Sequence, residues 1–191
     1  MEGTPETVPS KEKPPIEIDD ATPADARNIQ NVFYKAWLRT YPNEEAGVTV
    51  DDIEDRFKDS FSEERIQRLQ NRIHWSPPNE RFLVARVAGK AVAACRVIRN
   101  EDKNDLQAIY ILPEYQGQGI GRQLWNEGKT FFDDTKDTFV EVAAYNQNAI
   151  DFYTKLGFED TGKRFVDEKF RLKSGATIPQ MEMRIHGRIN P

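Results

Sequence analysis

A glycine-rich stretch, Gln116-Gly117-Gln118-Gly119-Ile120-Gly121, lies between a largely apolar run at 106–111 and a run with helical spacing. The first turn of a helix leaves its N–H groups unpaired, and the helix dipole there favours negative charge. Glycine lets the main chain approach an anion closely, so a phosphate or pyrophosphate group is the expected ligand. The alternative is a flexible turn that binds no ligand.

Two well-known phosphate-binding patterns do not fit this stretch. A dinucleotide-binding fingerprint requires a third glycine at the position that Arg122 occupies. A Walker loop requires a glycine at the position of Gln123, five residues before Gly128-Lys129-Thr130. That second match also falls inside a predicted helix, so we treat it as accidental.

The apolar spacing around the loop predicts the order of helices and strands. Before the loop we predict a short strand at 16–18, helices beginning at 22–25 and spanning 50–73, and strands at 82–87, 91–98 and 106–111. After it we predict a helix that carries Leu124, Trp125, Phe131 and Phe132, a strand at 138–142, a helix from Asn146 to a cap at Gly157, and strands near 158–166 and 178–186. This order predicts a single α+β domain over 16–191. Residues 1–15 contain four prolines and few apolar residues, so we predict a disordered leader there.

Composition narrows the classes of protein and of partner. No apolar run approaches the length needed to cross a bilayer, which predicts no membrane partner. A net charge of −5 disfavours a nucleic-acid partner. Cys95 is the single cysteine, so no internal disulfide forms and a cytoplasmic location is predicted. Cys95 itself fits a buried apolar residue better than a nucleophile. His74 and His186 are isolated and no residues have metal-ligand spacing, so no metal is predicted.

Two sequence blocks carry a family resemblance. Gln116-x-x-Gly119-x-Gly121 matches the Gln/Arg-x-x-Gly-x-Gly/Ala signature of the GNAT superfamily of N-acetyltransferases. Residues 146–158 are similar to the family's second block, Asn-x-x-Ala-x-x-Phe-Tyr-x-Lys-x-Gly-Phe. The detailed match spans about 105–165, and the order of elements extends it from about 16 to 187.

The resemblance implies a fold and a co-substrate. The GNAT acyl-CoA N-acyltransferase fold is a mixed, mostly antiparallel twisted sheet flanked by about four helices, and its donor is acetyl-CoA. The main chain of Ile109, Tyr110 and Ile111 would then pair with the pantetheine arm, and the Ile111 amide would polarise the acetyl carbonyl. The coenzyme pyrophosphate would contact Gln116, Gly117, Gln118, Gly119, Ile120, Gly121 and the adjoining Arg122.

The resemblance also implies roles for particular side chains. Tyr153 occupies the family position of the general acid for the departing thiolate, and the alternative is a core aromatic residue. Asn148 would hydrogen-bond the pantetheine arm, whereas Asn146 either does the same or only caps its helix. Glu141 is a candidate general base, with a solvent-facing strand carboxylate as the alternative.

The acceptor is predicted to be a primary amine. Residues 41–64 carry nine carboxylates and only two basic residues, Arg56 and Lys58. This excess of negative charge would attract a polycation, and the alternative is an ordinary solvated helix surface. The segment from Trp37 to Tyr41 resembles bacterial acetyltransferases of the polyamine (spermidine) type. Tyr41 and Trp37 would wall an amine pocket, and the alternative for Trp37 is a place in the core. The alternatives are a protein or peptide N-acetyltransferase and a non-catalytic acyl-CoA-binding module. A homodimer is compatible with the resemblance.

Overall fold

The computed structural model describes residues 14–168 and 171–188. The predicted disordered leader therefore lies almost wholly outside the described residues, since 1–13 are not among them. Pro14 and Pro15 are exposed and belong to no helix or strand. No helix in these two ranges combines the length and the apolar composition needed to cross a bilayer.

The described residues form seven strands and five α-helices. The strands are β1 (Ile16–Asp20), β2 (Glu80–Val87), β3 (Lys90–Arg99), β4 (Asn104–Ile111), β5 (Thr138–Ala143), β6 (Glu159–Val166) and β7 (Pro179–Ile185). The helices are α1 (Ala26–Thr40), α2 (Val50–Phe57), α3 (Glu63–His74), α4 (Ile120–Gly128) and α5 (Gln147–Lys155).

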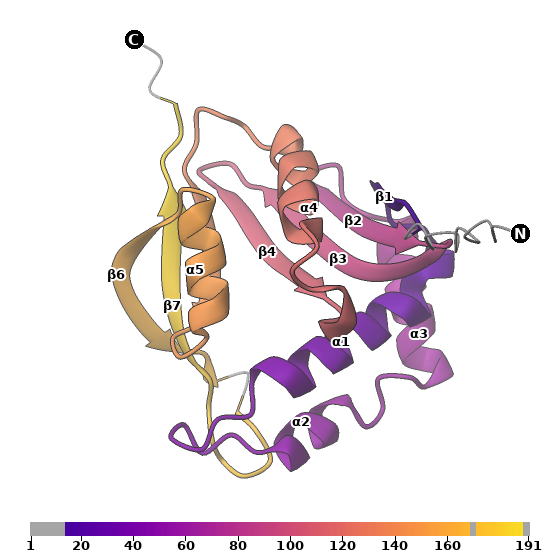
Figure 1. Ribbon diagram of the computed structural model, residues 1–191, viewed down its shortest axis with the longest axis vertical. Helices are drawn as coiled ribbons and strands as arrows, with labels where there is room; N and C mark the ends of the chain where they lie inside the picture. The colour runs from indigo at the N-terminus through magenta and orange to yellow at the C-terminus, as the bar shows by residue number, and fades with distance from the viewer. Residues whose placement is uncertain (1–13, 169–170, 189–191) are drawn as a thin grey trace, which may run out of the picture.

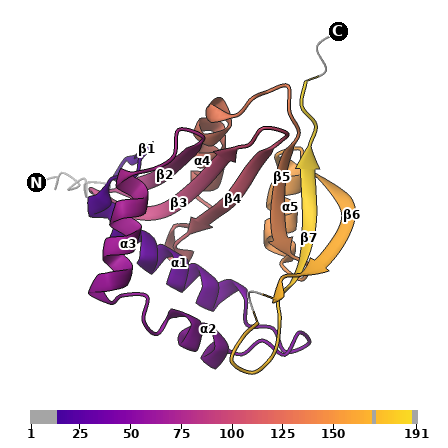
Figure 2. The same ribbon diagram turned by 180° about the vertical axis from the view of Figure 1, so that it is seen from behind.

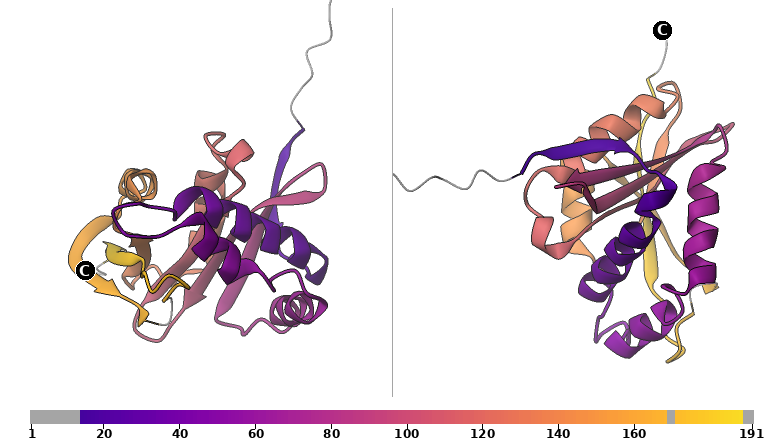
Figure 3. Two further views of the ribbon diagram at one scale, coloured as in Figure 1. Left: turned by 90° about the horizontal axis from the view of Figure 1, so that it is seen from below. Right: turned by 90° about the vertical axis from the view of Figure 1, so that its right-hand side faces the viewer.

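All seven strands belong to one sheet in the order β1-β2-β3-β4-β5-β7-β6. Only the β4–β5 pair is parallel, and every other neighbouring pair is antiparallel. Helices α4 and α5 cover one face of the sheet (Figure 1), and α1, α2 and α3 lie on the other face (Figure 2). Figure 3 shows the sheet edge-on between these two layers. The prediction of a mixed, mostly antiparallel sheet flanked by helices is confirmed.

The sheet and helices enclose three apolar clusters. The largest lies between the sheet and α4 and α5, and Leu83, Leu106 and Leu124 are fully buried in it. A second cluster lies under α1 and α3. A third cluster, centred on Ile53 and Phe57, joins α1 and α2 to the segment before β7. The apolar runs that predict the strands thus correspond to burial against the two helical layers.

The predicted helix over 50–73 is in fact two helices, which is why the fold has five rather than about four. Thr49 caps α2, because its hydroxyl accepts the Asp52 N–H at 3.1 Å. Ser62 caps α3 by accepting the Arg65 N–H at 3.4 Å. Short polar side chains between the two helices compete with helical hydrogen bonding and favour a new start. A second difference is that α4 ends at Gly128, so that Phe131 and Phe132 follow the helix.

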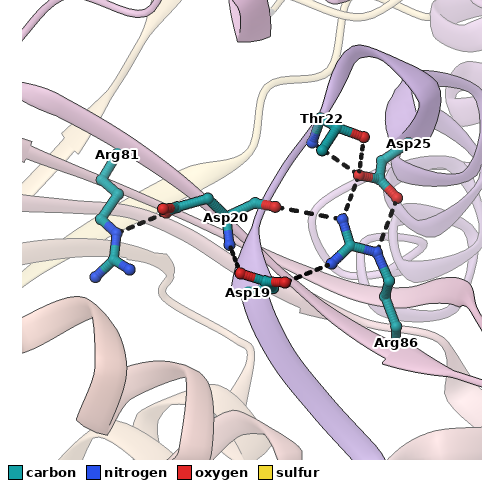
Figure 4. A network of polar contacts seen from close by, with 6 residues as sticks. All are labelled: Asp19, Asp20, Thr22, Asp25, Arg81 and Arg86. Atoms are coloured by element: carbon teal, nitrogen blue, oxygen red, sulfur yellow. Dashed lines mark hydrogen bonds and ion pairs between the residues drawn. The ribbon is translucent and has the colours of Figure 1, made fainter.

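A network of ion pairs fastens β1 and the start of α1 to β2 (Figure 4). The Arg86 guanidinium donates to the Asp25 carboxylate at 2.6 Å and to the Asp20 carbonyl at 3.3 Å. Arg81 donates to the Asp20 carboxylate at 2.7 Å. Burial alone would raise the pKa of Asp25, but hydrogen bonds from Arg86 and Thr22 lower it overall. Asp25 is therefore ionised and held on the side of the sheet away from α5.

A buried carboxylate under α3 yields a stability prediction. Glu80 accepts from Arg72 at 2.6 Å and from Arg96 at 2.8 Å, and its side chain is 3% exposed. Burial would raise the pKa of Glu80, but hydrogen bonds from Arg96 and Arg72 lower it from 4.5 to about 2. We expect Glu80→Gln to lower the free energy of unfolding at pH 7 by about 3 kcal/mol.

The pH dependence of that loss follows from the sign of the shift. A lowered folded-state pKa adds stability that is complete above the unfolded pKa and disappears as pH falls through the folded pKa. Urea unfolding of Glu80→Gln and wild type should therefore differ most at neutral pH and converge between pH 4.5 and about 2. A difference that stays constant over this range would contradict the assignment. Glu63→Gln, which removes an exposed partner of Arg27, is the control and should change little.

Candidate active site

The parallel strands β4 and β5 separate after three residue pairs. Asn104, Asp105 and Leu106 pair with Thr138, Phe139 and Val140, and beyond these the strands diverge (Figure 2). The register of β3 against β4 shifts between Arg96 and Val97, which leaves Gln107 as an extra residue in β4. Such a bulge bends a strand, and here the bend coincides with the point where β4 leaves β5.

A cavity of about 930 Å³ occupies the gap between the diverging strands. From one face of the sheet it is lined by the glycine-rich loop, the first turn of α4, and α5. From the other face it is lined by the C-terminal end of α1 and residues 41–43. The cavity therefore passes through the sheet, and two molecules can enter it from opposite faces.

The main chain of β4 presents alternate residues to this cavity. Leu112 donates to the Val92 carbonyl at 2.9 Å, and the same register pairs Tyr110 with Ala94 and Ile111 with Ala93. In an antiparallel pair, hydrogen-bonded and non-hydrogen-bonded residue pairs alternate. The N–H and C=O groups of Ile111, and those of Ile109 two residues earlier, therefore point away from β3 and into the gap. The Tyr110 main chain points toward β3, so Tyr110 reaches the cavity only through its side chain.

The glycine-rich loop presents a series of free N–H groups. Among the described residues, none accepts a hydrogen bond from the main-chain N–H groups of Gly117 to Arg122. Gly117 and Gly119 have φ angles of +73° and +79°, which side chains disfavour and which turn successive N–H groups to one side. The Gln116 N–H is engaged with the Pro113 carbonyl at 3.3 Å. The free series thus begins one residue later than predicted.

Gly121 and Gln116 set the position of this loop. A Cβ atom at Gly121 would lie 3.0 Å from the Phe152 ring and 3.3 Å from the Ile111 side chain. Only glycine therefore lets the first turn of α4 approach both β4 and α5 this closely. The Gln116 side chain donates to the Ile111 carbonyl at 3.2 Å and ties the loop to the end of β4.

Tyr153, on α5, is buried but its hydroxyl faces the cavity. Its ring packs edge-on against Phe152 and Phe158, with centroid distances of 5.2 and 5.5 Å. No residue in the described ranges hydrogen-bonds the hydroxyl. Every fully buried side-chain polar atom in those ranges has a hydrogen-bond partner, so this unpartnered hydroxyl is not fully buried. Because Tyr153 lines the cavity, the hydroxyl is open to it. Burial raises the pKa of Tyr153 well above its usual value, as do the neighbouring Tyr110 and Cys95. Tyr153 is therefore protonated at neutral pH.

The two asparagines at the start of α5 both line the cavity. The Asn146 side chain accepts the Ala149 N–H at 3.2 Å, so Asn146 caps the helix as predicted. Asn148 is exposed on the first turn of α5 and lines the cavity. Its amide is accordingly available to a ligand that follows the gap.

Glu141 and Cys95 are the other two groups with candidate chemistry. Glu141 is exposed on β5 and lines the cavity opposite β4. Partial burial raises the pKa of Glu141, although Lys163 and Lys103 lower it in part. Cys95 is fully buried, and burial raises the pKa of its thiol to about 12. Cys95 does not line the cavity, which agrees with its interpretation as a buried apolar residue.

Tyrosines form the wall of the cavity on the α1 side. Tyr41 and Tyr110 share a hydrogen bond between their hydroxyl groups at 3.0 Å, and the Tyr145 hydroxyl donates to the Tyr41 carbonyl at 2.7 Å. Burial raises the pKa of all three phenols. Trp37 does not line the cavity but packs behind Tyr41 at 4.3 Å, and the Arg56 guanidinium lies 4.8 Å from its ring centre. Tyr41 thus faces the cavity, and Trp37 supports it.

The nine carboxylates of residues 41–64 all lie outside the cavity lining. Asp52 is buried, and Asp51, Asp55, Glu63 and Glu64 form ion pairs with lysine or arginine. The others, Glu44, Glu45, Glu54 and Asp59, are exposed. This distribution fits a solvated surface near the α1 side of the cavity. These carboxylates can attract a cation over a distance but do not contact a molecule inside the cavity.

Tyr145 is a cavity residue that the sequence interpretation missed. It lies two residues after β5 and directly before the Asn146 cap, at the carboxyl end of a strand whose neighbour diverges. Residues in such strand-to-helix connections often carry function, and this position was the available signal. Arg39 and Asn43 also line the cavity, but nothing in their sequence context distinguishes them.

Comparison with known proteins agrees with this arrangement. Residues 37–174, more than two thirds of the chain, match the family described as the acetyltransferase (GNAT) domain. An uncharacterized N-acetyltransferase of Methanocaldococcus jannaschii is 34% identical over 88 residues, which cover 41% of this chain and 39% of that protein. The peptidyl-lysine N-acetyltransferase YjaB of Salmonella typhimurium is 35% identical over 63 residues, covering 33% of this chain and 41% of that protein. The matches thus span about two fifths of either relative.

The fold is shared with solved structures of low sequence identity. The PaiA N-acetyltransferase of Thermoplasma acidophilum, solved in complex with coenzyme A, superposes with a TM-score of 0.68 at 23% identity. The superposition covers 91% of this chain and 99% of that chain. At this level of identity the likeness establishes the fold alone.

Proposed function

Because this chain belongs to the acetyltransferase (GNAT) family, we propose that it transfers the acetyl group of acetyl-CoA to a primary amine. The observation that carries the proposal is the cavity that passes through the sheet, with free N–H groups on one side and Tyr153 facing its interior. Family membership supports the acyl donor, and the cavity provides room for donor and acceptor together. The buried Cys95 is unsuited to carry the acetyl group, which supports direct transfer in a ternary complex.

The residues at hand fit acetyl-CoA as the donor. The N–H groups of Gly117 to Arg122 are unpaired donors at a helix N-terminus, which is the chemistry that a pyrophosphate requires. The outward N–H and C=O groups of Ile109 and Ile111 match an extended amide-containing arm such as pantetheine. Asn148 adds a side-chain amide beside the same path.

The chemistry divides among three groups of this chain. The amine nitrogen attacks the thioester carbonyl carbon, and the Ile111 N–H donates a hydrogen bond to the carbonyl oxygen as negative charge grows there. Tyr153 gives its proton to the sulfur as the C–S bond breaks, which requires the phenol to be protonated. Glu141 takes the proton that the amine loses, directly or through water, and its raised pKa makes it a better base than an ordinary carboxylate.

We propose a small polyamine of the spermidine type as the acceptor. The resemblance of the segment ending at Tyr41 supports this choice, and the exposed carboxylates near the α1 side of the cavity would attract a polycation. The side chain of a peptidyl lysine is a second candidate, because the Salmonella relative is named for that substrate. Both acceptors present an unbranched alkylamine to the same tyrosine-lined wall.

An amine panel tests the proposal. We expect acetyl-CoA-dependent thiol release that requires an added amine, with spermidine turned over faster than a blocked lysine peptide, a peptide α-amine or an aminoglycoside. A lysine peptide as the best acceptor would favour the second candidate. Binding of acetyl-CoA by calorimetry without release on any amine would support a non-catalytic acyl-CoA-binding module instead.

A further inference from the structure

We propose that Asp52 is a positioning residue for the acceptor amine. It links the connection between β6 and β7 to the start of α2, and this link fixes the cavity wall that Tyr41 forms. The inference rests on the proposed function, because it concerns how the α1 side of the cavity binds the acceptor. It assigns a role in catalysis to a residue that does not line the cavity.

The Asp52 carboxylate is almost fully buried, at 2% exposure, and accepts four hydrogen bonds. One oxygen accepts from the Thr49 N–H at 2.9 Å, the Thr49 hydroxyl at 2.8 Å and the Ser174 hydroxyl at 2.9 Å. The other oxygen accepts from the Ser174 N–H at 2.7 Å. Half of these bonds thus come from a residue 122 positions further along the chain. Helix capping alone would need only those from Thr49.

Apolar packing joins the same two segments. Val48 and Ile53 pack with Leu172 and Ile178 in one buried cluster, which also includes Ala143 at the end of β5. Tyr41, Trp37 and Tyr145 are partly buried against this cluster. Ala143 in the cluster, and Tyr41 and Tyr145 at its edge, also line the cavity. The linked segments and the cavity wall are therefore one packed unit.

Hydrogen bonds connect this unit to Tyr41. Asn43 and Val48 exchange main-chain hydrogen bonds at 2.8 and 2.9 Å, which closes the loop that follows α1. The Tyr145 hydroxyl holds the Tyr41 carbonyl at 2.7 Å, and the Tyr41 hydroxyl pairs with Tyr110 at 3.0 Å. A shift at the start of α2 is thus transmitted to the Tyr41 ring, because the loop between them is closed and packed. The coenzyme side is separate, since the glycine-rich loop lies on the other face of the sheet (Figures 1 and 2).

The test compares two variants by their separate effects on the two substrates. Asp52→Asn keeps the shape of the side chain but places an NH₂ group against the N–H or hydroxyl donors of Thr49 and Ser174. Ser174→Ala removes only the hydrogen bond from the Ser174 hydroxyl and keeps the one from its N–H. With spermidine as the probe, or a lysine peptide if that is the better acceptor, we expect Asp52→Asn to raise the acceptor KM about tenfold. Ser174→Ala should raise it by a smaller factor, and the KM for acetyl-CoA should stay within about twofold in both variants.

Asp25→Asn is the matched control. Asp25 is likewise a buried carboxylate in a capping box, with Thr22 and Arg86 as its partners, but it does not line or border the cavity. It should reduce stability without changing either KM, measured at a temperature at which all variants are folded. An unchanged acceptor KM in Asp52→Asn, or an equal rise in both KM values, would overturn the inference.

A second readout does not depend on turnover. Amide hydrogen exchange in Asp52→Asn should become faster in residues 41–49 and 172–178 and stay unchanged in residues 117–122, relative to the wild type. Absence of faster exchange in the first two segments would also overturn the inference. Failure of the wild type to release thiol with any amine would instead count against the proposed function, so the two failures are distinguishable.

Discussion

Replacement of Tyr153 by phenylalanine is expected to lower kcat for acetyl transfer by about 10²- to 10⁴-fold. The phenylalanine ring keeps its contacts with Phe152 and Phe158, and only the hydroxyl is lost. Because no described residue hydrogen-bonds that hydroxyl, its removal leaves no group of the protein unpaired. The sulfur, however, then leaves without a positioned proton donor. Stability and affinity for acetyl-CoA should therefore change little while the chemical step slows.

The measurement combines thiol release at saturating acetyl-CoA and amine with calorimetric titration of acetyl-CoA. Tyr34→Phe is the control, because Tyr34 packs against Phe57 and Phe61 and does not line the cavity. It should retain the wild-type kcat. Retention of kcat within about threefold by Tyr153→Phe would mean that another group protonates the thiolate, and Tyr153 would then be a core aromatic residue.

Gly121→Val is expected to raise the Kd for acetyl-CoA about 100-fold. The first side-chain carbon would already lie 3.0 Å from the Phe152 ring, and valine adds two methyl groups to that contact. The first turn of α4 must then move away from β4 and α5, and its free N–H groups move with it. Overpacking should also lower the free energy of unfolding by about 1–3 kcal/mol.

Gly128→Val separates the two effects of this substitution. Gly128 ends the same helix, and a Cβ atom there would lie 3.1 Å from the Val97 side chain, so the steric conflict is similar. Gly128 lies away from the cavity, however, so this variant should lose stability with little change in the Kd for acetyl-CoA. Calorimetry on both variants tests this. Equal loss of affinity in both would attribute the effect to general disruption of α4 rather than to the loop.

Much of the fold was predictable because local patterns coincide with burial. The apolar runs of β2 and β3 and the cap at Asn146 lie close in sequence to the elements they define. The division of residues 50–73 was not predicted, because the apolar spacing continues across the polar break that Ser62 ends. At this break the capping side chains, and not the apolar periodicity, determine where one helix ends and the next begins.

The site was predictable where it depends on main-chain chemistry and less so where it depends on register. The loop from Gly117 to Gly121 is recognisable from its residues alone. The main-chain N–H and C=O groups of Ile109 and Ile111 point into the gap, whereas those of Tyr110 point toward β3. This difference depends on the pairing with β3 and on the bulge at Gln107, which no local sequence pattern shows. The contact between Asp52 and Ser174 joins residues far apart in the chain, and only the folded sheet brings them together.

The short parallel contact between β4 and β5 gives acetyl-CoA a second role besides supplying the acetyl group. Beyond Leu106, β4 and β5 are not paired with each other in the described residues. Bound acetyl-CoA would therefore bridge the two halves of the sheet where strand pairing is absent. A ligand that binds only the folded state stabilises it by about 2.7 kcal/mol at a concentration 100 times its Kd. Scarcity of acetyl-CoA would thus shorten the half-life of the protein against proteolysis as well as slow its turnover, coupling its abundance to the supply of its own substrate.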